Sequence, residues 1–114
     1  MHELAVTQEV LKIALDKARE VKAKRVTDIN LVIGELSGII DDSVQFYFDF
    51  LAKDSIAEQA KLHFKRVDTK VCCRQCGIDF QPEILPAICP SCQAVDAQIK
   101  SGREFFVESI EVDE

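Results

Sequence analysis

Apolar residues recur every three or four positions over the first part of the chain, from about Leu4 to Lys24. The residues that share this spacing are Val6, Val10, Ile13, Ala14, Leu15, Ala18 and Val21. The pattern predicts an amphipathic helix, because such a stripe lies along one face of a helix. The segment contains neither proline nor glycine, and its basic end suits the negative end of a helix dipole.

The pattern changes to alternation between Val26 and Leu36, which predicts a strand with Ile29, Leu31 and Ile33 on one face. Gly34 and Gly38 then indicate a turn.

Two more strands are predicted at Lys61–Val67 and Arg103–Val112. In the first, Leu62 and Phe64 face one way, while Lys61, His63 and Lys65 face the other. In the second, the apolar positions change phase near Ser109, which indicates a bulge.

A second helix is predicted after the turn, where Asp41, Asp42 and Ser43 offer N-caps. Val44, Tyr47, Phe48 and Leu51 form its apolar stripe, and Phe46 and Phe50 broaden it. Because aromatic clusters are more often core than binding surface, we expect these rings to be buried.

Two cysteine pairs, Cys73-x-x-Cys76 and Cys89-x-x-Cys92, are separated by twelve residues. Two thiolates with this spacing can bind one ion from a tight turn, and four of them suit a closed, tetrahedral, structural Zn²⁺ site. Gly77 follows the first pair, where a positive φ is often needed, whereas Gln93 follows the second.

Alternatives to this zinc site are rubredoxin-like iron, two disulfides or ordinary buried thiols. Cys72 could also shift the first pair to Cys72-x-x-x-Cys76, but Cys73 repeats the two-residue gap of the second pair.

The segment around the cysteines, from about Val71 to Gln98, contains all three prolines and few large apolar residues. We expect metal to hold it together. The fold class is therefore α+β: a small mixed three-stranded sheet with two helices on one face, plus an inserted zinc-ribbon domain. The predicted domains are residues 1–68 with 102–114, and residues 69–101.

Composition narrows the classes of function. No apolar segment approaches the ~20 residues that cross a bilayer, and no signal peptide is recognisable, so we expect a cytoplasmic protein with no membrane partner. The net charge of −6 opposes nucleic-acid binding. With two histidines and no glycine-rich phosphate loop, an enzyme is not indicated.

The first residues, Met1-His2-Glu3, offer a second kind of metal chemistry. The α-amine of Met1 with the backbone nitrogen and imidazole of His2 can form fused chelate rings, and Glu3 can add a backbone nitrogen or its carboxylate. Nitrogen-rich coordination favours Ni²⁺ or Cu²⁺. A histidine after the initiator is also commonly just a surface residue.

Four features together resemble the HypA/HybF family of nickel metallochaperones. They are the start Met-His-Glu-Leu, the stretch Ile33-Gly34-Glu35-Leu36-Ser37, the two cysteine pairs and the ending Ile110-Glu111-Val112. The resemblance covers nearly the whole chain in the same order.

The resemblance implies Ni(II) held at the N-terminus by His2 with Glu3 and the Met1 amine, and a structural Zn(II) held by Cys73, Cys76, Cys89 and Cys92. It also implies a HypB-type GTPase partner and delivery of nickel to the precursor of the [NiFe]-hydrogenase large subunit; some relatives serve urease. We expect a monomer or a weak homodimer. The alternative is a zinc-ribbon adaptor without a labile metal.

Overall fold

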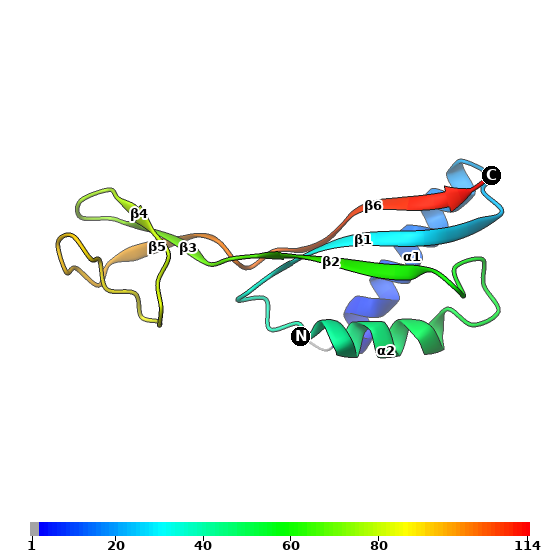
Figure 1. Ribbon diagram of the computed structural model, residues 1–114, viewed down its shortest axis with the longest axis horizontal. Coiled ribbons are helices and arrows are strands. Elements are labelled where there is room, and N and C mark those ends of the chain that lie inside the picture. Colours follow the sequence, from blue (N-terminus) through cyan, green and yellow to red (C-terminus); the bar gives the residue numbers. More distant parts are fainter. Residues whose placement is uncertain (1–2) are drawn as a thin grey trace. The chain divides into compact units, whose positions relative to one another are not determined.

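The computed structural model describes residues 3–114, which form two helices and two three-stranded sheets (Figure 1). The first sheet has the strand order β2-β1-β6 and the second has the order β4-β3-β5. The elements in chain order are α1 (Glu3–Glu20), β1 (Arg25–Gly34), α2 (Asp41–Leu51), β2 (Lys61–Val67), β3 (Lys70–Cys73), β4 (Asp79–Phe80), β5 (Ala97–Ser101) and β6 (Phe105–Asp113).

The chain divides into two compact units. The helical unit comprises the chain up to Val32, Gly38–Lys65 and Phe105–Glu114. The ribbon unit comprises Ile33–Ser37 and Arg66–Glu104.

The sheet of the helical unit is mixed, as predicted. Thr27 and Asn30 of β1 bond to Glu111 and Ser109 of β6, so these strands run antiparallel. The chain passes from β1 through α2 to β2, which runs in the same direction as β1 (Figure 1). Helix α1 packs against α2 and β6.

The core of the helical unit combines one stripe from each helix with one face of the sheet. Its largest fully buried side chains are Phe48, Ile29, Leu31, Val26, Val44 and Thr7. The alternation that predicted β1 is therefore confirmed at Ile29 and Leu31. Both predicted faces of β2 are also confirmed, since Leu62 is buried and Lys61, His63 and Lys65 are exposed.

Helix α1 ends four residues earlier than the apolar periodicity predicted, at Glu20. Lys22 takes a positive φ of 56°, and Ala23 N–H bonds to the Ala18 carbonyl at 2.9 Å. Lys22 N–H bonds to the Arg19 carbonyl at 3.2 Å, which completes a Schellman ending. The turn takes Val21 off the buried face and leaves it 57% exposed.

Two predictions for α2 are wrong. Ile40 occupies the N-cap position and no side chain caps the helix there, although Asp41 and Asp42 do lie in the first turn. Phe46 and Phe50 are 70% and 67% exposed, because the buried face of an eleven-residue helix is filled by Val44 and Phe48.

The last strand, β6, alternates exposed and half-buried residues and changes phase at Glu108 and Ser109, which are both exposed. This position agrees with the phase change in the sequence. No helix among residues 3–114 has the length and apolar character needed to span a bilayer.

The ribbon unit contains a small sheet that the sequence pattern did not predict. β3 pairs antiparallel with β4, where Val71 lies opposite Phe80, and with β5, where Cys73 lies opposite Ala97. The strands are two to five residues long, too short for a recognisable alternation.

Two glycines allow two chain segments of the ribbon unit to approach closely. Gly34 N–H bonds to the Glu104 carbonyl at 2.6 Å. A Cβ on Gly34 would lie 2.7 Å from Glu104 N and closer still to the Gly102 carbonyl. Gly102 itself has a φ of +116°. Nearby, the Thr69 hydroxyl, on a buried residue, donates to Glu35 Oε1 at 2.5 Å.

Candidate metal centre

The two cysteine pairs lie on turns with the same backbone hydrogen bonds. Cys73 N–H bonds to the Ile78 carbonyl at 2.8 Å, and Gly77 N–H bonds to the Cys73 carbonyl at 2.9 Å. The second turn repeats both bonds: Cys89 N–H to Ala94 at 2.9 Å, and Gln93 N–H to Cys89 at 2.8 Å.

Gln93 is the counterpart of Gly77 in the second turn. Gly77 has a φ of 79° and Gln93 a φ of 64°, so both take the left-handed conformation. The sequence predicted this conformation for Gly77 only. The signal that could have revealed Gln93 was its place directly after the second pair, because equal spacing requires an equal turn.

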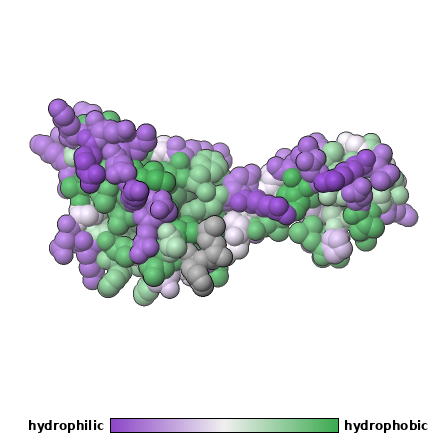
Figure 2. All heavy atoms as spheres, turned by 180° about the vertical axis from the view of Figure 1, so that it is seen from behind, coloured by the Kyte–Doolittle hydropathy of each residue, from purple (hydrophilic) through white to green (hydrophobic). Residues whose placement is uncertain are grey.

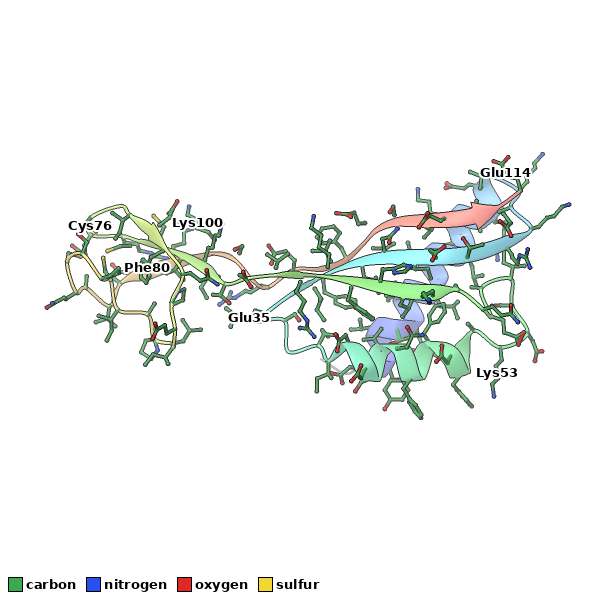
Figure 3. All side chains as sticks on the ribbon, viewed as in Figure 1. Glu35, Lys53, Cys76, Phe80, Lys100 and Glu114 are labelled. Carbon is green, nitrogen blue, oxygen red and sulfur yellow. The ribbon has the colours of Figure 1, made fainter. Side chains whose placement is uncertain are left out.

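The turns bring the four predicted cysteines into one cluster, in which every sulfur lies within 4.8 Å of the others. Cys73 Sγ is 3.5 Å from Cys92 Sγ, and Cys76 Sγ is 3.5 Å from Cys89 Sγ. The short distances therefore join one turn to the other. The sulfur atoms gather between the loops at the Cys76 end of the ribbon unit (Figure 3).

This cluster fits a tetrahedral ion. Zn–S bonds of ~2.3 Å require sulfur–sulfur separations of roughly 3.8 Å in a regular tetrahedron. The first cysteine of each turn is buried and the second is exposed, so the cluster lies at the edge of the unit. Four thiolates complete the coordination and leave no position for a substrate.

The four cysteines form two groups, one with lowered and one with raised thiol pKa values, because backbone amides and neighbouring thiols act on them differently. The backbone N–H of Cys92, followed by that of Ser91, lowers the pKa of Cys89 to about 6. The N–H groups of Cys76 and Gln75 likewise lower the pKa of Cys73. Backbone amides therefore favour the thiolate form of the buried cysteine in each turn.

The second cysteine of each turn has the opposite tendency. The Ala94 N–H favours the Cys92 thiolate, but the neighbouring thiol of Cys73, burial and Cys89 outweigh it and raise the pKa of Cys92 to about 12. The pKa of Cys76 is also raised: the Ile78 N–H opposes the rise, and burial and Cys89 cause it. A cation among these sulfurs would supply the charge that stabilises all four thiolates.

Cys72 lies outside the cluster. Its Sγ is directed to the carbonyls of Cys73 and Gly77, at 3.7 Å from each, and its pKa is raised by a hydrogen bond with Asp79. The structure therefore groups Cys73, and not Cys72, with the other three cysteines.

The predicted nickel ligands Met1 and His2 lie outside the described residues. Glu3 is the first residue of α1, and its Oε2 accepts a hydrogen bond of 3.3 Å from Ile40 N–H, directly ahead of α2. Its carbonyl accepts a bond of 2.5 Å from the Thr7 hydroxyl. The Glu3 carboxylate therefore links the first residue of α1 to the residue directly ahead of α2.

His63 is exposed on the strand face, as expected, but it is paired. Its Nε2 lies 2.7 Å from Asp28 Oδ1 across β1 and β2. Hydrogen bonding to His63, followed by that to Thr27, lowers the pKa of Asp28.

The profile of one protein family, described as "HypA: Hydrogenase/urease nickel incorporation, metallochaperone, hypA", matches residues 1–112. The chain belongs to the HypA family. The resemblance drawn from the sequence motifs is therefore confirmed.

Similar proteins named "Hydrogenase maturation factor HypA" cover nearly the whole chain. One from Dehalococcoides mccartyi strain 195 is 47% identical over 114 residues, covering 100% of this chain and 96% of the relative. Another from Caldanaerobacter subterraneus is 45% identical and covers 99% of this chain and 100% of the relative.

The fold is shared with solved structures of HypA proteins. The solution structure of the nickel metallochaperone HypA from Helicobacter pylori superposes with a TM-score of 0.70 at 23% identity, covering 99% of this chain and 98% of that one. A second solution structure of a HypA protein has a TM-score of 0.75, also at 23% identity. The predicted fold class is confirmed, and the four-cysteine cluster fits its zinc site.

Proposed function

We propose that this HypA-family chain binds Ni(II) at its N-terminus and delivers it to the precursor of the [NiFe]-hydrogenase large subunit. The family description supports nickel incorporation, and the relatives at 45–47% identity are named as hydrogenase maturation factors. The match over residues 1–112 is the observation that carries the proposal, since it includes both the terminal motif and the cysteine turns.

In this proposal, residues 1–68 with 102–114 form the nickel-binding domain, and residues 69–101 form the zinc ribbon. Cys73, Cys76, Cys89 and Cys92 hold a structural Zn(II). When bound, the ion would cross-link the two turns and neutralise the thiolates. The equal hydrogen bonding of both turns supports this role, because each turn presents its pair in the same way.

Nickel is the cargo and requires a site that can open. The Met1 amine, the His2 nitrogens and Glu3 are the proposed ligands. These groups are few and lie at a chain end, so a partner can add or withdraw a ligand without rearranging a core. The donors must lose protons, and unperturbed imidazole and α-amine groups titrate near ~6.5 and ~7.7–8.0, so nickel affinity should rise from about pH 6 to pH 8.

A carrier of this kind needs a partner for release. We propose a HypB-type GTPase for that role, in the cytoplasm, with no catalytic chemistry in this chain itself. The family's maturation function supports hydrogenase as the destination.

The test uses untagged protein that begins with its authentic Met1 and is saturated with zinc. Such protein should bind one further equivalent of Ni²⁺ by calorimetry. His2→Ala should abolish that binding and leave zinc content unchanged. One residue added before Met1 should do the same, because it removes the α-amine.

Normal nickel binding by the extended protein would exclude the amine as a ligand. Absence of any second equivalent in the authentic protein would contradict the carrier function and favour a zinc-ribbon adaptor.

A further inference from the structure

An apolar groove of about 450 Å³ lies between the second half of α1 and the last strand, β6. Its apolar lining consists of Ile13 and Val21, from α1 and the turn after it, and Val107, Ile110 and Val112 of β6. Ile13 and Val21 are 40% and 57% exposed, whereas the three β6 residues are half-buried. Figure 2 shows the side of the helical unit on which α1 lies, where apolar and charged side chains both reach the surface. The groove therefore keeps apolar surface in contact with water.

One wall of the groove is also an open edge of a β-sheet. β6 is an outer strand in the order β2-β1-β6, and no other strand in the described part of the chain pairs with its far edge (Figure 1). The carbonyls of Glu111 and Asp113 accept hydrogen bonds from Thr27 and from the residue directly ahead of β1, at 3.1 Å and 2.8 Å. Because successive residues of a strand point their backbone polar groups to opposite sides, those of Ile110 and Val112 point to the open edge.

The two edges of this sheet differ in their protection against pairing with another strand. β2 carries Lys61 and Lys65 on its exposed face, and lysine at an edge opposes the addition of a strand. β6 contains no lysine, arginine or proline. The phase change at Glu108 and Ser109 interrupts β6, but the residues from Ile110 to Asp113 follow it as an unprotected edge.

The charges around the groove favour a basic partner. On α1, Lys17 and Glu20 line the groove and pair with each other at 3.4 Å, so their charges offset each other. On β6, Glu108 lies 4.0 Å from Lys65, and Glu111 is exposed. The balance along the strand is acidic, as is the net charge of −6 of the whole chain. This charge attracts lysine and arginine side chains.

We propose that the open edge of β6 binds an extended segment of a partner protein in which apolar and basic residues alternate. The segment adds a strand to the sheet through hydrogen bonds to the backbone of Ile110 and Val112. Its apolar side chains lie opposite these two residues and enter the groove, and its basic side chains lie opposite Glu111 on the other face of the sheet. The contact requires no nickel, so it is independent of the proposed carrier function.

The first experiment uses a peptide with blocked ends and the sequence Lys-Val-Lys-Val-Lys-Val-Lys. It is titrated into the full-length, zinc-loaded protein and followed by NMR. Binding should saturate below about 1 mM. The amide signals of Ile110 and Val112 should shift, and both amides should exchange more slowly with solvent, because they gain hydrogen-bond acceptors.

Control peptides separate the three contributions to binding. Replacement of every valine by serine should weaken binding at least about tenfold, because the apolar contacts in the groove are lost. Replacement of every lysine by glutamate should weaken binding by a similar factor, because like charges then meet at β6. N-methylation of the peptide amides that face β6 should abolish binding, because it removes their hydrogen-bond donors.

Variants of the protein test the same contacts from the other side. Val21→Ser should weaken binding of the lysine peptide about three- to tenfold, because it removes an exposed apolar wall of the groove. Phe46→Ala is the matched control, since it removes a 70% exposed ring of α2 and should leave the affinity unchanged. Glu111→Lys should weaken binding of the lysine peptide and strengthen binding of the glutamate peptide. Circular dichroism and zinc content should match the parent in each variant.

Absence of saturable binding up to about 1 mM would overturn the proposal. Binding that leaves the exchange of Ile110 and Val112 unchanged would exclude strand addition, and equal affinity for the serine peptide would exclude the groove. Either result would overturn the proposal, and so would loss of affinity in Phe46→Ala equal to that in Val21→Ser. If the peptide acts only by dissociating a dimer of the chain, the edge is occupied by a second copy and the assignment to a partner protein is wrong.

Discussion

The two units of this chain differ in how much apolar side-chain surface they bury. The helical unit buries Phe48, Ile29, Leu31 and a stripe from each helix, so hydrophobic burial stabilises it. The ribbon unit buries few side chains beyond Ile33, Val71, Ala87, Thr69 and two cysteines, and it leaves Ile84 and Ile88 at 72% and 59% exposure. The first unit therefore has an apolar core to stabilise it, whereas we expect the second to depend on its four clustered cysteines and on close backbone contacts.

The largest effect should come from the cysteine cluster. Cys89→Ser should release zinc and unfold the ribbon unit, because structural zinc contributes about 10–16 kcal/mol in small fingers. Metal analysis and residue-resolved hydrogen exchange would measure this, with protection retained in the helical unit.

Cys72→Ser is the matched control, since Cys72 lies outside the cluster. It should retain zinc. If Cys72→Ser lost the metal and Cys73→Ser kept it, the cluster assignment would be wrong.

The next effect belongs to the core of the helical unit. Phe48→Ala should lower the free energy of unfolding by about 3–5 kcal/mol, since it leaves a cavity at a 0% exposed site. Zinc content should not change. Phe46→Ala, two positions away, should lower the free energy of unfolding very little, by about 0.5 kcal/mol or less. Equal losses for both would contradict the burial difference between them.

A smaller effect is expected where the backbone segments approach. Gly34→Ala should cost about 1–3 kcal/mol, because the added methyl meets the backbone of Gly102 and Glu104, which cannot turn aside. Gly38→Ala tests conformation alone, since Gly38 has a φ of +75° and open space around it. It should cost about 1 kcal/mol. Chemical denaturation of zinc-loaded protein would rank the two variants, and the reverse order would refute the steric argument.

The smallest effect is electrostatic and depends on pH. The folded-state pKa of Asp28 is lower than its ordinary value of 3.8, mainly through the hydrogen bond with His63. Its contribution to stability is therefore fully present above pH 3.8 and disappears as the pH falls through the lower folded value.

Asp28→Asn should accordingly destabilise the protein slightly at pH 5, and the difference from the parent should shrink on acidification. Thermal unfolding at several pH values would measure it. In a His63→Gln background the same substitution should lose most of its effect. A difference that grows below pH 3.8 would contradict the sign.

Sequence patterns were a better guide where burial is periodic. β2 begins and ends where predicted, and Ile29 and Leu31 are buried as the alternation indicated. The even spacing of the cysteine pairs also identified the four residues that the structure groups together.

Sequence patterns failed where a local turn or contacts between distant segments determine the structure. The end of α1 depends on a left-handed Lys22, which composition does not reveal. Phe46 and Phe50 are exposed because only the face of α2 that carries Val44 and Phe48 is covered by the rest of the unit. The strands of the ribbon unit are short and pair with one another around the cysteine turns. They are too short to show a periodic pattern in the sequence, so the sequence does not predict them.

The hydrogen bond from Ile40 N–H to the Glu3 carboxylate joins positions 37 residues apart. If nickel binds the same oxygen of that carboxylate, it competes with the amide ahead of α2 for this acceptor. Cargo at the chain's first residues would then be reported as a change in the amide signal of Ile40. Through the same hydrogen bond, a partner protein that binds α2 and moves Ile40 would change the affinity of the proposed nickel site.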